Sequence, residues 1–102
     1  MQCGNAHSFG GAPAEAIVDL LIELYKQKQF SAMAEKAEIL SGQYPNSFMV
    51  WSLSGAANKG LGKLEEARNA FERVTILNPG YAGGFNNLAV VLQEQGDVFN
   101  AA

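Results

Sequence analysis

Residues of similar kind recur 34 positions apart along this chain of 102 residues. Pro45 and Pro79 are separated by this interval, and so are Gly62 and Gly96. The same interval joins further pairs: Ile17 with Trp51, Trp51 with Phe85, Phe30 with Leu64, and Ala67 with Ala101. A fixed period of this length is typical of stacked helical hairpins, in which each unit buries its apolar face against the next. Such a chain presents a surface built by repetition, so binding is the first function to consider.

Composition narrows the class of partner. Apolar residues make up 48 % of the sequence and charged residues 17 %, as in a folded domain. The formal net charge is −3 without a basic stripe, so we expect no nucleic-acid partner. The longest apolar run, from Leu20 to Ile22, lies between Asp19 and Glu23 and is too short to span a bilayer, so we expect no membrane partner. The single cysteine, Cys3, cannot form an internal disulfide, which favours a cytoplasmic location.

The first part of the chain divides into a tail and the beginning of a helical domain. Residues 1–12 are rich in glycine, alanine and polar side chains without periodicity, which predicts a flexible tail. The predicted domain covers residues 13–102, because Pro13 suits the first turn of a helix. The next apolar side chains have helical i, i+3, i+4 and i+7 spacing and form a predicted core stripe: Ile17, Leu20, Leu21 and Leu24.

Turn signals divide the rest of the domain into further helices. A second helix is predicted after Phe30, with Ser31 as its N-cap, and Pro45 ends it. Asn46 or Ser47 then caps a third helix, which closes near residues 59–60. The predicted inner faces hold Met33, Ala37 and Leu40 in the second helix, and Trp51, Gly55 and Ala56 in the third.

Glycine and proline also separate the last predicted helices. Gly62 allows a tight turn into a fourth helix, and residues 78–80 (Asn-Pro-Gly) end it. A fifth helix follows, and Gly96 with Asp97 is expected to turn the chain into a sixth. No segment shows sustained strand alternation, so the predicted fold class is all-α. The apolar faces comprise Leu64, Ala67, Phe71, Val74 and Leu77 in the fourth helix, and Phe85, Leu88, Ala89 and Leu92 in the fifth.

Large and small residues at fixed spacing carry a family resemblance: Trp51, Gly55, Ala67, Phe71 and Pro79. They resemble the tetratricopeptide repeat, whose motif is W-x₂-L-G-x₂-Y, then A-x₃-F, then P. Its repeats would be residues 14–47, 48–81 and a truncated 82–102, although Ser54 and Asn58 replace an apolar and an aromatic residue. Small residues suit the close approach of two helices, and large ones fill the gaps beside them. The resemblance implies a right-handed superhelical array (an α-solenoid) of antiparallel helix pairs, with a concave groove that binds a peptide or partner protein.

The resemblance also implies which side chains face that groove. They are Val18, Asp19, Ile22 and Tyr25 in the first repeat, Ser52 and Leu53 in the second, and Asn86, Asn87 and Val90 in the third. Ala56 and Lys59 share this face by register. Chaperone-binding members hold a carboxylate with a clamp of Lys, Arg and Asn, of which only Asn87 is present here, so that clamp is absent. The apolar groove residues of the first helix either contact a partner or pack against a neighbouring repeat or the tail.

Catalytic and metal-binding patterns are absent from the sequence. Cys3 and His7 form at most two ligands in a glycine-rich tail, so we expect neither a metal site nor a cofactor. No phosphate-loop spacing and no nucleophile–histidine set occurs, so we expect no enzyme. The charged cluster of the fourth helix is predicted to be an exposed face with i, i+3 and i+4 partners: Glu65, Glu66, Arg68, Glu72 and Arg73.

The incomplete third repeat predicts self-association. A first helix of this family hides its apolar face under its own second helix, and residues 98–102 are too few to do that. Covering one large apolar side chain contributes about 1.5–3 kcal/mol, so we expect a homodimer or higher assembly. The residues predicted to associate are Phe85, Leu88, Leu92, Val98 and Phe99. Two alternatives remain: an N-terminal fragment of a larger glycosyltransferase- or sulfotransferase-like protein that positions its substrate, and a purely structural self-assembly unit.

Overall fold

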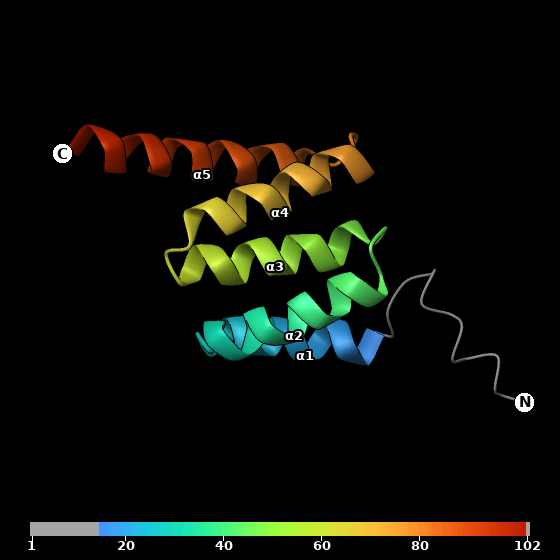
Figure 1. The fold of residues 1–102 in the computed structure, drawn as a ribbon. Helices are drawn as coiled ribbons and strands as arrows, with labels where there is room; N and C mark the ends of the chain where they lie inside the picture. The colour runs from blue at the N-terminus through green and yellow to red at the C-terminus, as the bar shows by residue number, and fades with distance from the viewer. Residues whose placement is uncertain (1–14, 102) are drawn as a thin grey trace, which may run out of the picture.

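The described residues form five helices and no strand, which confirms the predicted all-α class (Figure 1). The computed structural model describes the backbone of residues 15–101 and the side chains of residues 15–96. The helices are α1 (Glu15–Lys26), α2 (Phe30–Gln43), α3 (Phe48–Gly60), α4 (Leu64–Leu77) and α5 (Ala82–Ala101). Helices α2 and α4 begin and end 34 residues apart, and α3 and α5 begin 34 residues apart. The interval in the sequence is therefore an interval between helices.

The helices pack in the order in which the chain makes them. Contacts join α1 to α2, α2 to α3, α3 to α4 and α4 to α5, and α1 also touches α3. Figure 1 shows α1 and α2 at one end of this series of layers and α5 at the other. Helices α3 and α4 therefore have helical neighbours on two sides, whereas α5 has one face that no other described helix covers.

Two clusters of buried apolar side chains hold the layers together. The first joins α1, α2 and α3 through Leu21, Met33, Ala37, Leu40, Val50 and Ala57. The second joins α4 and α5 through Ala67, Phe71, Val74 and Val91. The predicted inner face of α2 is confirmed, because all three of its apolar members are buried. Each large side chain buried in this way stabilises the fold by about 1.5–3 kcal/mol.

Small residues mark the places where helices come closest. A Cβ atom added to Gly55 would lie 2.6 Å from Cε1 of the buried Phe71 ring. A Cβ atom added to Gly60 would lie 2.6 Å from the ring of Phe30. Glycine at these two positions thus lets an aromatic ring rest directly on the backbone of α3. The predicted pairing of a small residue with a large one is confirmed between α3 and α4.

Several predicted turns are confirmed. The backbone N–H of Val50 donates a hydrogen bond of 3.3 Å to Oγ of Ser47, which is therefore the N-cap of α3. Gly62 has a φ of 78°, the left-handed conformation that the short connection between α3 and α4 requires. Helix α4 ends at Leu77, directly before the Asn-Pro-Gly sequence.

Three predictions about helix ends and faces are wrong. Ser31 is not an N-cap, because Lys28 (φ 60°) turns the chain early and α2 begins at Phe30 after Gln29. Leu20 is 47 % exposed, because its face of α1 has no preceding helix among the described residues. Gly96 and Asp97 do not turn the chain, since α5 continues to Ala101. An isolated glycine only weakens a helix, and no proline follows to end this one.

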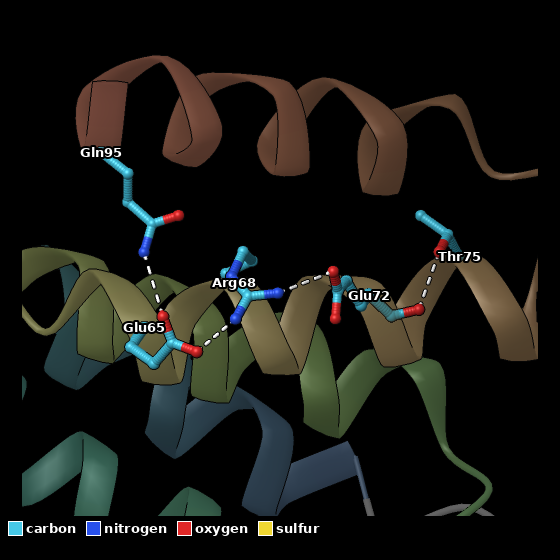
Figure 2. A network of polar contacts seen from close by, with 5 residues as sticks. All are labelled: Glu65, Arg68, Glu72, Thr75 and Gln95. Atoms are coloured by element: carbon cyan, nitrogen blue, oxygen red, sulfur yellow. Dashed lines mark hydrogen bonds and ion pairs between the residues drawn. The ribbon is translucent and has the colours of Figure 1, made fainter. Parts of the chain in front are cut away.

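A polar network on α4 reaches α5 (Figure 2). Arg68 donates hydrogen bonds to Oε2 of Glu65 and, at 3.0 Å, to Oε2 of Glu72. The amide of Gln95 on α5 donates to Oε1 of Glu65 at 3.3 Å. The hydrogen bond to Glu65 and the charge of that carboxylate raise the pKa of Arg68 above its ordinary value, with a smaller effect from Glu72. The predicted i, i+3 and i+4 pairing of the charged cluster is confirmed at Arg68.

Candidate functional site

Side chains from α1, α3 and α5 converge on a hollow of about 420 Å³, which we call the α1–α3–α5 hollow. These three helices alternate along the chain with α2 and α4, and they bring together residues far apart in the sequence. The lining consists of Tyr25 from α1, Ala56, Lys59 and Gly60 from α3, Asn87 and Val90 from α5, and the rings of Phe30 and Phe71.

Aromatic rings form one wall of the α1–α3–α5 hollow. The rings of Tyr25 and Phe30 meet edge to face, with centroids 5.7 Å apart and planes inclined by 64°. Phe30 can lie there because Gly60 has no side chain to displace it. Tyr25 is 47 % exposed, so part of its side chain is accessible to a ligand. An amphipathic ring in this position suits an apolar side chain with a polar neighbour.

The α1–α3–α5 hollow also contains polar side chains. Lys59 on α3 is in reach of Glu94 on α5, with Nζ and Oε2 3.6 Å apart, and both side chains stay partly exposed. The side-chain amide of Asn87 makes no hydrogen bond to any other described residue, and Asn87 is exposed. An amide offers two donors and one acceptor, the same groups that a peptide backbone presents. The hollow thus combines an apolar wall with an unused amide.

The structure brings together five of the residues predicted to face the groove and places the others elsewhere. The five that line the hollow are Tyr25, Ala56, Lys59, Asn87 and Val90. Asp19, Ile22 and Asn86 are exposed but do not line it, and Val18 is half-buried. Leu53 packs against the first core cluster. The Oγ atom of Ser52 is buried and has no hydrogen-bond partner among the described residues.

The prediction did not include three of the lining residues. Phe30 and Phe71 belong to α2 and α4, whereas the register considered only first helices. Both rings reach the hollow over glycines, Phe30 over Gly60 and Phe71 over Gly55. The signal that could have found Phe30 is the glycine at the end of α3, 30 residues further along the chain.

A larger hollow of about 570 Å³ lies among α2, α3 and α4. Its wall carries three carboxylates and one lysine: Glu35, Glu38, Glu66 and Lys63. Trp51 also lines it, but its Nε1–H already donates to the carbonyl of Pro45 at 2.8 Å. The amide of Asn58 in turn donates to the carbonyl of Ser54 at 2.9 Å. Trp51 and Asn58 thus already have hydrogen-bond partners, and the other charged side chains of this hollow are mostly acidic. The α1–α3–α5 hollow has a wall of aromatic rings instead, so we consider it the better site for an apolar anchor.

The residues predicted for self-association do not share one environment in the structure. Phe85 and Leu92 are 49 % and 48 % exposed, on the face of α5 that no described helix covers. Leu88 instead packs against the second core cluster, next to the fully buried Val91, which the prediction did not include. The side chains of Val98 and Phe99 lie outside the described residues.

Among the described residues, no three His, Cys, Asp or Glu side chains gather as a metal site. The Cys3 and His7 pair lies outside this part of the chain. No described helix has both the length and the apolar character needed to cross a membrane. Compared with family models and with curated proteins, the sequence matches none.

Proposed function

We propose that this protein is a non-catalytic interaction module, acting in the cytoplasm, that binds a peptide segment of a partner protein. In this proposal the helix pairs form a tetratricopeptide-like, right-handed array, and the α1–α3–α5 hollow is its binding groove. One observation carries the proposal: Tyr25, Lys59 and Asn87, from three helices, converge on one hollow. A surface shared by alternate helices is what a repeat fold offers to an extended ligand.

The chemistry of the hollow defines the ligand class. The edge-to-face rings of Tyr25 and Phe30, together with Val90, suit an apolar side chain. The amide of Asn87 suits the N–H and C=O groups of a peptide backbone. Lys59 favours an acidic or neutral peptide over a basic one, although Glu94 offsets part of its charge. The proposed ligand is therefore a peptide with an apolar anchor and no cluster of basic residues.

Selection from a random peptide library tests this proposal, and neighbouring asparagines supply a matched pair of variants. Asn87 lines the hollow, whereas Asn86 is exposed on the same helix outside it. For a selected peptide, Asn87→Ala should weaken binding by about 1 kcal/mol, roughly fivefold in Kd, because a hydrogen bond is lost. Asn86→Ala should leave the Kd unchanged.

A second variant tests the aromatic wall. Tyr25→Ala removes the exposed ring and should weaken the same peptide by more than Asn87→Ala does, since a large apolar contact disappears. Circular dichroism of each variant establishes that the helices are retained. Equal binding by the wild type, Tyr25→Ala and Asn87→Ala would show that the peptide binds elsewhere. A library that yields no ligand at all would count against the proposed function.

A further inference from the structure

We propose that two copies of this chain associate through α5, antiparallel to one another, about a two-fold axis between Ala89 and Leu92. The contact is a stripe of four residues, which we call the outer stripe: Phe85, Ala89, Leu92 and Gly96. They follow one another at intervals of 4, 3 and 4 residues, so they share one face of the helix. This inference does not depend on peptide binding, because Asn87 and Val90 line the hollow from another face of α5.

The fold itself shows what this face lacks. Trp51 and Gly55 on α3 precede Phe85 and Ala89 of the outer stripe by 34 positions. On α3 that face is covered by α4, and the Phe71 ring lies against Gly55. On α5 the corresponding residues, Phe85 and Ala89, are exposed. The same type of helix face is thus covered on α3, whereas on α5 no other described helix covers it.

The order of residues in the outer stripe makes a second copy a fitting cover. Along the chain they read large, small, large, small, so the reversed helix reads small, large, small, large. In an antiparallel pair, Phe85 of one copy faces Gly96 of the other, and Leu92 faces Ala89. Every one of the four layers then joins one large and one small residue, the combination that already seats Phe71 on Gly55. A Cβ atom at Gly96 would have no neighbour within 4 Å among the described residues, which is consistent with space for a ring of the second copy.

Charge favours this pairing as well. Between Phe85 and Gly96, the span of the outer stripe, the only charged residue is Glu94, and it lies 3.6 Å from Lys59 of its own chain. Two outer stripes can therefore approach one another without opposing like charges. The contact is isologous, as a two-fold pair requires, and leaves both hollows open. A dimer of this kind presents two binding grooves and would bind a repeated peptide more tightly than a single copy does.

Sedimentation equilibrium over a range of protein concentrations tests the association. The wild type should rise from 10.9 kDa, the mass of one chain, towards twice that value. Leu92→Glu should weaken the dimer at least tenfold, because it puts two charges into the contact. Ile76→Glu is the matched control: Ile76 is 69 % exposed on α4, outside the outer stripe, and its variant should dimerise as the wild type does. A wild type that stays at 10.9 kDa up to about 1 mM, or equal weakening by both variants, would overturn the inference.

Two further measurements separate specific packing from general stickiness. Gly96→Leu adds apolar surface and favours the helix, but it fills the space proposed for Phe85, so the dimer should weaken. Tighter association of this variant would overturn the inference. In a Cys3→Ser background, a mixture of Ala89→Cys and Leu92→Cys chains should form disulfide-linked dimers faster than either variant alone. Faster linkage of Ala89→Cys to itself would indicate a parallel pair and would likewise overturn the inference.

Discussion

Substitution of Gly55 by alanine is a sharp test of the packing between α3 and α4. Gly55 lies in the interior of α3 and is buried. The added Cβ would lie 2.6, 2.7 and 2.8 Å from Cε1, Cζ and Cδ1 of Phe71. These distances are well below ordinary carbon–carbon contact, which begins near 3.5 Å. Either the ring or the helix must move.

Two opposing effects set the magnitude. Alanine is the better helix former, which by itself would stabilise the protein by about 1 kcal/mol. Overpacking of a core costs about 1–3 kcal/mol, and Phe71 is only 2 % exposed, so its ring cannot swing into solvent. We therefore expect Gly55→Ala to lose up to about 2 kcal/mol of the free energy of unfolding, and not to gain the stability that alanine would add on its own. For a domain of this size that lowers the Tm by roughly 4–8 °C per kcal/mol.

Gly42→Ala supplies the matched control. Gly42 lies in α2 and is exposed, and a Cβ there would have nothing within 4 Å. Only the helix-propensity effect applies, so its Tm should rise. Thermal and urea unfolding, followed by circular dichroism, measure both variants. A rise in Tm for Gly55→Ala equal to that for Gly42→Ala would refute the close approach of Phe71 to α3. If the ring is the cause, Phe71→Leu should cost less in the G55A background than in the wild type.

Three other predictions concern single sites. Ser52→Ala should leave the urea midpoint unchanged or raise it, since it removes a buried hydroxyl without a described partner; a loss above about 1 kcal/mol would contradict this. Gly96→Ala should stabilise the protein by up to about 1 kcal/mol, because Gly96 lies inside the continuous helix α5. Gly62→Ala should destabilise it by about 1–2 kcal/mol, because Gly62 has a φ of 78°. Similar losses of stability for both variants in thermal unfolding would indicate a turn at Gly96. Glu94→Gln should lower the free energy of unfolding by less than about 1 kcal/mol in chemical unfolding, because the ion pair of Glu94 with Lys59 is partly exposed. A larger loss that high salt does not reduce would contradict the assignment of this ion pair to the surface.

The sequence predicted the helices well where local signals and the repeat agreed. Residues 78–80 break the chain in any context, and Ser47 offers the side-chain oxygen that an N-cap needs. Gly62 and Gly96 show the limit of such signals. Both are glycines at the same repeat position, yet only Gly62 adopts positive φ. Glycine permits a turn but does not impose one, and the packing around it decides.

Buried faces were harder to predict than helices, because they depend on which neighbours are present. Leu20 and Leu21 fit the same helical spacing, yet Leu21 is buried and Leu20 is half exposed. The reason is that, among the described helices, α1 has neighbours on one side only. No local sequence pattern predicts which side of a helix has a neighbour. The spacing on α5 pointed to Phe85 and Leu92, whereas the fully buried residue is Val91.

The candidate site was predicted in outline, from register alone. Register placed Tyr25, Asn87 and Val90 on one face, and all three line the hollow. Ser52 and Leu53 lie on the same side of α3 as Ala56 and Gly60 but about one turn earlier, where they are in contacts between helices. Helical register thus defines a face, but not how far a hollow extends along it.

The most direct test of the proposed function is an NMR titration of the wild type with a library-selected peptide. The account predicts that the largest amide shifts fall together on Tyr25, Lys59 and Asn87, three residues of different helices that only the folded hollow brings together. Largest shifts at Glu35 and Glu66, in the larger hollow among α2, α3 and α4, would contradict it.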